Sequence, residues 1–210
     1  INLISTVDKN GPGVEMANDE KAITNPRRAF LIERIKFDQL KGLEIGPLNE
    51  PLVTNEDLQG QGEIFYLDHL STDELKEKYS DDPSVDVENI VNVDFVCPDG
   101  DLVEAVSGNQ FDYVVASHVI EHVPNILKFL QGAQKVLKSG GKLFLIIPDK
   151  RFTFDYERRE TTFGDVLDSF LSDDTKPSVR AVYDHFAKAV EKSAHEAWYG
   201  LLDGKQSKKL

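Results

Sequence analysis

Two histidines and one glutamate gather after a short apolar run, at positions His118, Glu121 and His122. Imidazole takes up a proton near neutral pH, so His118 is the best candidate for a catalytic base, with His122 or Glu121 behind it. On one helical turn the three side chains share a face, where they could also bind a divalent metal ion or brace the loop by hydrogen bonds. The spacing leaves a base, a metal site and a structural role open.

Carboxylates follow two other apolar runs. Asp68 comes after the run 64–67, where a carboxylate can accept hydrogen bonds from both hydroxyls of a ribose. Asp99 comes after the run 91–96, where it can accept from the amino group of an adenine while Gly100 offers a backbone amide. Each aspartate also fits an ordinary turn at the end of a strand, so both interpretations stay open.

A single glycine, Gly46, ends the first apolar run and allows backbone to approach a ligand closely. A dinucleotide site would need G-x-G-x-x-G at the start of a helix, to hold a pyrophosphate on backbone amides. Here Pro47 and Pro51 follow the glycine, so a pyrophosphate site is poorly supported. Glu44 adds a negative charge beside the turn, which favours a ligand with an ammonium or sulfonium group.

The elements that must position these residues alternate along the chain. Asn25 and Pro26 predict the start of a helix over 26–41, and Gly42 predicts its end. A capping-box pattern that begins at Ser71 predicts a second helix, and the spacing of apolar residues predicts a third. The expected strands are 43–45, 64–67, 91–96, 111–116 and 142–147, and the expected later helices are 72–79 and 125–138, the last ended by Ser139-Gly140-Gly141.

This alternation predicts an α/β fold, a Rossmann-like, doubly wound and mainly parallel sheet with helices on both faces and a helical C-terminal extension. In such a sheet the ligand binds at the carboxyl ends of the strands. These ends gather Gly46, Asp68, Asp99 and the pair Ser117–His118. The candidate residues are therefore expected to meet in one site.

The length of 210 residues suits one domain with a small appendage. We expect residues 1–24 to form a loosely ordered arm and residues 25–155 to form the ligand-binding domain. Residues 156–210 then form a helical C-terminal segment, either a substrate lid or the truncated end of the domain.

Composition excludes several classes of partner. The formal net charge of −13 repels phosphate backbones, so nucleic acid is not an expected partner. No apolar run approaches the roughly 20 residues that span a bilayer, so no membrane span is expected. The one cysteine, Cys97, allows no disulfide within the chain, and no signal peptide is visible, which together predict a cytoplasmic protein.

Five motifs in this order resemble class I S-adenosylmethionine-dependent methyltransferases over about residues 40–155. The motifs are LEIGP (43–47), YLDH (66–69), VDFVCPDGDL (93–102), FDYVVASHVIEHVPN (111–125) and VLKSGGKLFLIIPDK (136–150). LEIGPLNEP (43–51) and IIPDKRFTFDYERRETT (146–162) further resemble bacterial members of unassigned substrate, which are often linked with surface polysaccharide synthesis.

The resemblance implies S-adenosylmethionine as the cofactor and methyl transfer to an oxygen or nitrogen of a small-molecule or glycan acceptor. The cofactor-binding residues that it implies are Glu44, Gly46 and Pro47 for the methionine part, Asp68 and His69 for the ribose, Asp99, Gly100 and Leu102 for the adenine, and Ser117 and His118 beside the sulfur. The histidine cluster also resembles the E-x-x-E-H site of some metal-assisted O-methyltransferases. Because His118 stands in place of one glutamate, no metal is carried over.

Departures from the family pattern keep other functions open. The glycine-poor first motif, and the lack of a closing antiparallel hairpin in 151–210, favour a binding module without turnover. Asp99-Gly100-Asp101 also matches the D-x-D metal motif of glycosyltransferases that use nucleotide sugars. After the last strand, Lys150, Arg151 and Asp155 are expected to border the acceptor pocket, where the two cations would attract an anionic acceptor.

Overall fold

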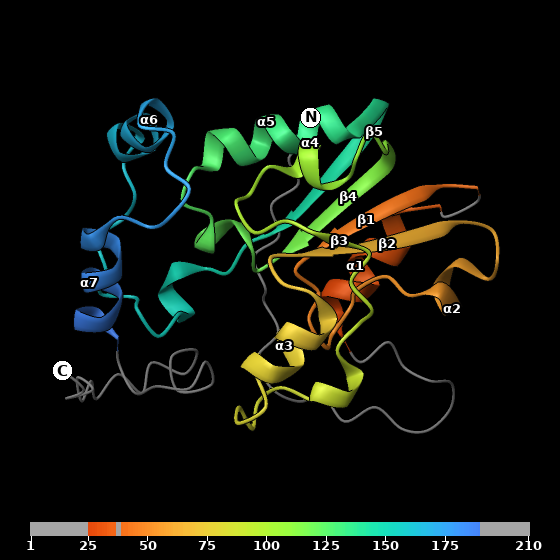
Figure 1. The fold of residues 1–210 in the computed structure, drawn as a ribbon, viewed down its shortest axis with the longest axis horizontal. Coiled ribbons are helices and arrows are strands. Elements are labelled where there is room, and N and C mark those ends of the chain that lie inside the picture. The colour runs from red at the N-terminus through yellow and green to blue at the C-terminus, as the bar shows by residue number, and fades with distance from the viewer. Residues whose placement is uncertain (1–24, 37–38, 190–210) are drawn as a thin grey trace.

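The computed structural model describes residues 25–36 and 39–189, and its five parallel strands form one sheet in the order β3-β2-β1-β4-β5 (Figure 1). The strands are β1 (Lys41–Ile45), β2 (Glu63–Asp68), β3 (Phe95–Val96), β4 (Phe111–Ser117) and β5 (Leu137–Ile146). The chain runs outward from β1 to β3 and then returns to place β4 on the other side of β1. The predicted doubly wound α/β fold is therefore confirmed.

Helices connect the strands and extend the chain beyond the sheet. They are α1 (Pro26–Arg34), α2 (Asn55–Leu58), α3 (Thr72–Lys78), α4 (Leu102–Ala105), α5 (Ile126–Val136), α6 (Phe163–Leu171) and α7 (Val179–Lys188), with short 3-10 turns η1 (Val87–Asn89), η2 (Ile120–His122) and η3 (Lys150–Phe152). Figure 1 shows α6 and α7 to one side of the sheet, away from α1 and α2. In the described part of the chain, no helix is long and apolar enough to cross a membrane.

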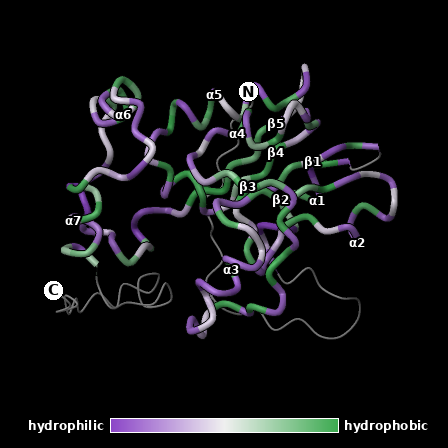
Figure 2. The backbone as a smooth tube through the Cα atoms, in the orientation of Figure 1, coloured by the Kyte–Doolittle hydropathy of each residue, from purple (hydrophilic) through white to green (hydrophobic). Residues whose placement is uncertain are grey.

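The sheet is buried on both faces because its strands carry apolar residues at successive positions. On one face Leu43 and Val114 pack against Phe129 and Ala133 of α5. On the other face Val115, Phe144 and Ile146 pack with Leu31 of α1 and Leu58 of α2. Figure 2 shows this apolar character along β4 and β5. Continuous apolar strands of this kind are typical of a parallel sheet covered by helices on both sides.

The strand register aligns the ends that carry the candidate residues. Ile45 pairs with Leu67 on one side and with Ala116 on the other. The next residue in each strand or loop is Gly46, Asp68 or Ser117, so these three positions leave the sheet at one level. Parallel pairing therefore brings together positions that lie far apart in the sequence.

The first helix is shorter than predicted. It ends at Arg34, since Ile35 has extended backbone angles (φ −103°, ψ 115°) and is buried beneath the sheet. Lys41 and Gly42 belong to β1, so Gly42 does not stop a helix. A side chain at position 42 would run into the ring of Tyr113 in β4, which explains the glycine by close packing between neighbouring strands.

Two other predicted boundaries were wrong. The strand expected at 91–96 is reduced to Phe95–Val96, because the amides of Val91 and Val93 donate to Leu48 and Thr72 instead of to a strand. The glycines after α5 do not form a loop, since β5 begins at Leu137 directly after the helix. Gly140 adopts φ +79° within this strand, and the β4–β5 pairing shifts register between Phe111 and Tyr113. The arm expected at 1–24 and the end of the C-terminal segment, 190–210, lie outside the described residues.

Candidate functional site

A cavity of about 590 Å³ opens at the carboxyl ends of the strands, on the side of the sheet that α4 and α5 cover. Its lining comes from the ends of β1 and β2, from the loops after β3 and β4, and from α3, α4 and α5. The volume lies within the roughly 300–1,000 Å³ of small-molecule sites. Its position is the point at which the strand order reverses, where α/β sheets bind their ligands.

The loop after β1 forms the floor of this cavity with two residues in left-handed backbone conformation. Gly46 has φ +66° and Leu48 has φ +50°, and both line the cavity. An added Cβ at Gly46 would come within 3.0 Å of the Val119 side chain. Position 46 therefore requires glycine for its conformation and for close approach to the loop after β4.

Glu44 faces the opposite side of the sheet from the cavity and is 1% exposed. Its two carboxylate oxygens accept hydrogen bonds from the backbone amides of Leu52 and Val53, at 2.8 and 3.1 Å. Burial raises the pKa of Glu44 from 4.5 to about 7, although both hydrogen bonds oppose the shift. The expectation that Glu44 faces the cofactor is thus corrected, because the carboxylate holds the β1 loop from behind.

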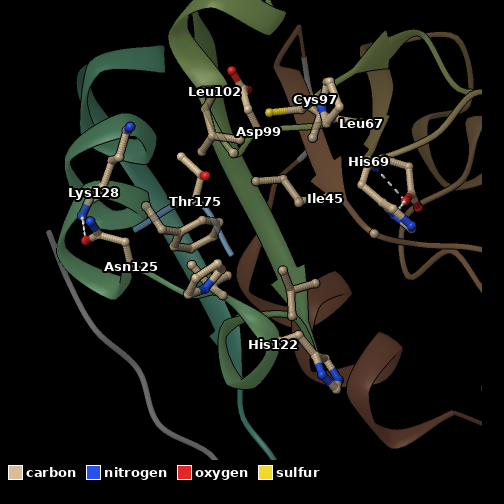
Figure 3. A pocket seen from close by; sticks show the side chains of 18 of the residues that line it. Ile45, Leu67, His69, Cys97, Asp99, Leu102, His122, Asn125, Lys128 and Thr175 are labelled. Carbon is tan, nitrogen blue, oxygen red and sulfur yellow. Dashed lines mark hydrogen bonds and ion pairs between the residues drawn. The ribbon is translucent and has the colours of Figure 1, made fainter. Parts of the chain in front are cut away.

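Asp68 ends β2 at the cavity and is hydrogen-bonded to the residue that follows it. Its Oδ1 atom accepts from the backbone amide of His69 at 2.7 Å and lies 2.6 Å from His69 Nδ1. The other ring nitrogen, Nε2, lies 3.0 Å from Nζ of Lys78 in α3. An ammonium can only donate, so this contact sets the proton of a neutral His69 on Nδ1, facing Asp68. In Figure 3 the ring of His69 lies on one side of the pocket.

The loop after β3 brings Cys97, Asp99 and Gly100 to the cavity, and Leu102 of α4 lies beside them (Figure 3). Asp101 is not directed there, because its Oδ1 atom accepts from the backbone amides of Val103 and Glu104 and so caps α4. The D-x-D interpretation loses support, since its second aspartate already serves as a helix cap.

The loop after β4 brings His118 and His122 to the cavity, whereas Glu121 does not line it. Nδ1 of His118 lies 3.7 Å from Oε1 of Glu121, and the His118 side chain is 46% exposed. His118 adopts φ +55°, a costly conformation for a residue with a side chain, and such positions cluster at functional sites. The trio is arranged around the 3-10 turn η2 and not on the predicted α-helical turn.

Three predicted cofactor residues are not part of the cavity lining. Besides Glu44 they are Pro47, which is buried in the loop, and Ser117, whose hydroxyl lies 3.4 Å from Nη1 of Arg27 in α1. The predicted residues that do line it are Gly46, Asp68, His69, Asp99, Gly100, Leu102, His118 and His122. Parallel pairing thus assembles most of the predicted site, and Arg27 is a neighbour that the sequence did not single out.

Residues missed by the sequence analysis complete the wall. Asn125, the N-cap of α5, and Lys128 of α5 line the cavity, as does Thr175 from the connection between α6 and α7. Figure 3 shows Thr175 between these α5 residues and Leu102. An ion pair of 2.8 Å between Lys128 and Asp173 holds this connection. Helical spacing placed α5 against the sheet, but no signal in the sequence pointed to Thr175.

The expected acceptor border after β5 is not part of the cavity. Nζ of Lys150 donates to the backbone oxygen of Tyr156 at 2.6 Å, Arg151 pairs with Asp149, and Asp155 lies 3.6 Å from Arg158. These charged side chains therefore bind to partners within the segment that follows β5. Among the described residues, no group of three or more histidine, cysteine or acidic side chains is placed to hold a metal ion.

The sheet order and the cavity define an α/β protein with a cavity of small-molecule size at the switch point of its sheet. A family model described as a methyltransferase domain matches residues 20–205. The chain belongs to this methyltransferase family.

Similarity to individual proteins is more limited. The mitochondrial ubiquinone biosynthesis O-methyltransferase of Rattus norvegicus is 52% identical over 40 residues, which are 19% of this chain and 12% of that protein. Its counterpart in Mus musculus is 49% identical over 51 residues, 23% of this chain and 14% of that protein. Among solved structures, precorrin-6y C5,15-methyltransferase of Geobacter metallireducens is 18% identical, with a TM-score of 0.40 and 74% of each chain covered.

Proposed function

We propose that this chain is an S-adenosylmethionine-dependent methyltransferase that acts on an oxygen or nitrogen of a small-molecule or glycan acceptor. One observation carries the proposal: Asp68 and Asp99 follow neighbouring parallel strands and line the same cavity as Gly46, at the switch point of the sheet. Membership of the methyltransferase family supports it. The resemblance of two segments to bacterial members linked with polysaccharide synthesis supports a glycan among the acceptors.

The residues present fit the chemical groups of this cofactor. Asp68 offers a carboxylate to ribose hydroxyls, and Asp99 offers one to an adenine amino group. Gly46, which has no side chain, leaves room at the floor of the cavity near the switch point, where the methionine part would lie. When bound, the cofactor supplies a methyl carbon that is already activated by its positive sulfur.

We assign to His118 the role of the base that takes up the proton of the acceptor. His118 would take up the proton that the acceptor atom loses on methylation, and the bound cofactor would supply the methyl group. The Glu121 carboxylate, 3.7 Å from Nδ1, stabilises the imidazolium that results. The exposed position of His118 then allows this proton to leave to solvent.

Calorimetric titration of the purified protein with S-adenosylmethionine and S-adenosylhomocysteine tests the cofactor. We expect both to bind, and we expect Asp68→Ala to weaken binding at least about tenfold, because hydrogen bonds to a carboxylate contribute roughly 1.5–3 kcal/mol. Asp81→Ala removes an exposed carboxylate outside the cavity and serves as the matched control. A folded parent protein that binds neither compound would overturn the proposal.

A second candidate function is a binding module with weak or no turnover. The glycine-poor loop favours it, because Pro47 and Leu48 stand where the family usually has glycine. Transfer of a labelled methyl group to any acceptor separates the two, since a binding module retains affinity for the cofactor without transferring the label.

A further inference from the structure

Helices α6 and α7 each expose an apolar stripe. On α6 the stripe consists of Phe163, Leu167 and Leu171, and Leu171 is 81% exposed. On α7 it consists of Val179, Val182, Tyr183 and Phe186, and Val179 is 88% exposed. The spacings of three, four and seven residues place each set on one helix face. Exposed apolar surface of this extent on a soluble domain marks an interaction site.

Contacts with the domain fix the direction of the α6 stripe. The hydroxyl of Ser169 donates to the backbone oxygen of Pro124, and Asn125 donates to the backbone oxygen of Ser169. At about 100° per residue, Leu167 and Leu171 lie on the side of the helix opposite Ser169. The bonds that anchor α6 on the start of α5 therefore hold its apolar stripe outward.

Charges beside the two stripes are opposite in sign. Residues 160–174, which include α6, contain five acidic residues and no lysine or arginine. Asp165 pairs with Arg159 and Asp173 pairs with Lys128, and with these two cations counted the stretch still carries a net charge of −3 (five acidic minus two basic residues). Residues 176–188, which include α7, contain Lys176, Arg180 and Lys188 against the single acidic residue Asp184. A net positive stretch is unusual in a chain with a formal charge of −13, and it complements the acidic stretch beside it.

We infer that this helix pair is a docking surface for a second copy of the chain. In a two-fold pair the same patch meets itself, so α6 of one copy faces α7 of its partner and α7 faces the partner's α6. This arrangement buries both stripes and sets each acidic stretch against a basic one. An anionic lipid surface is disfavoured as the occupant, because the α6 stretch keeps a net negative charge after its ion pairs with Arg159 and Lys128 are counted.

Sedimentation of the full chain between about 1 and 100 µM tests the inference. We expect a concentration-dependent dimer whose dissociation constant rises at least about tenfold in Leu171→Asp and in Val182→Asp. Val103→Asp is the matched control, because Val103 is an exposed apolar residue on α4, outside both stripes, and should leave the dimer unchanged. Asp168→Lys should weaken the dimer, and adding Lys176→Asp should restore it, since the double change reverses a charge on the acidic stretch and on the basic stretch.

Three results would overturn the inference. The first is a full chain that stays monomeric over the whole range. The second is a dimer that the Leu171 and Val182 variants weaken no more than Val103→Asp does. The third is a monomer that becomes a dimer only after removal of residues 190–210, which would assign the stripes to the chain's own C-terminal segment. These measurements need no ligand, so their outcome is independent of the proposed methyl transfer.

Discussion

The Glu44 carboxylate accepts a 2.8 Å hydrogen bond from the backbone amide of Leu52, so a strand residue holds the loop that follows its own strand. A second bond, from Val53, uses the other carboxylate oxygen. Gly46 and Leu48, which line the cavity, lie between Glu44 and Leu52, in the loop that these hydrogen bonds hold. The buried acid thus acts on the ligand site through the backbone and not by direct contact.

Replacing Glu44 by glutamine should flatten the pH dependence of stability. Burial raises the Glu44 pKa from 4.5 to about 7 in the folded chain, so the folded state binds the proton more tightly than the unfolded state does. The resulting stabilisation is fully present below pH 4.5 and is lost as pH rises through 7. Between pH 5.5 and 8.5 the parent should lose about 2 kcal/mol of unfolding free energy relative to Glu44→Gln.

Urea unfolding of both proteins across this pH range measures the difference. The variant is expected to be less stable at acid pH, because an amide –NH₂ cannot accept from the second backbone N–H. Parallel pH curves for parent and variant would contradict a raised pKa for Glu44, whatever the offset between them.

Gly46→Ala should weaken cofactor binding as well as stability, and Gly60→Ala separates the two effects. Both glycines have positive φ, +66° and +75°, so either alanine costs about 1 kcal/mol in backbone strain. Only at position 46 does the added Cβ press on Val119, at 3.0 Å, whereas position 60 has open space. We expect Gly46→Ala alone to raise the dissociation constant for S-adenosylhomocysteine, by about tenfold, in calorimetry. Equal constants for the two variants would contradict the role assigned to the β1 loop.

The positions at the strand ends could be predicted from the sequence, because parallel strands bring their carboxyl ends to one edge whatever the details of the helices. Gly46, Asp68, Asp99 and His118 line the cavity for this reason. The direction of Glu44 could not be predicted in the same way. A strand that is buried on both faces shows no alternation between polar and apolar residues, so the sequence does not reveal which face is which.

Boundaries set by tertiary contacts were also beyond sequence reasoning. A glycine such as Gly42 often follows the end of a helix, but here the ring of Tyr113 in the neighbouring strand is what requires it. Gly140 likewise lies within a strand and not in a loop. Thr175 reaches the cavity through an α6–α7 connection that the Lys128–Asp173 ion pair holds, and neither local pattern nor spacing encodes that long-range contact.

His118→Gln should lower kcat by about 100-fold or more while the affinity for S-adenosylhomocysteine stays within about threefold. Glutamine keeps the size of the side chain but cannot take up the acceptor's proton, so the acidic limb of the pH–rate profile should disappear. Glu121→Gln should cost less, because Glu121 acts only on the imidazolium, from 3.7 Å. His185→Gln is the control, since that ring packs on Phe154 and Phe186, outside the cavity lining. A kcat unchanged in His118→Gln would remove His118 as the base.

Cys97 should react slowly with iodoacetamide, and bound ligand should slow it further. The thiol lines the cavity, and burial, with the negative charges of Asp99 and Asp101, raises its pKa to about 11. Little thiolate exists at pH 7.5, so alkylation should run at least about tenfold more slowly than in the urea-unfolded chain. Because Cys97 is the only cysteine, intact-mass spectrometry reports on this site alone. Saturating S-adenosylhomocysteine should protect the thiol from alkylation. Alkylation as fast as in the unfolded chain would contradict the burial of Cys97, and an unprotected thiol would contradict placing the adenine beside Asp99.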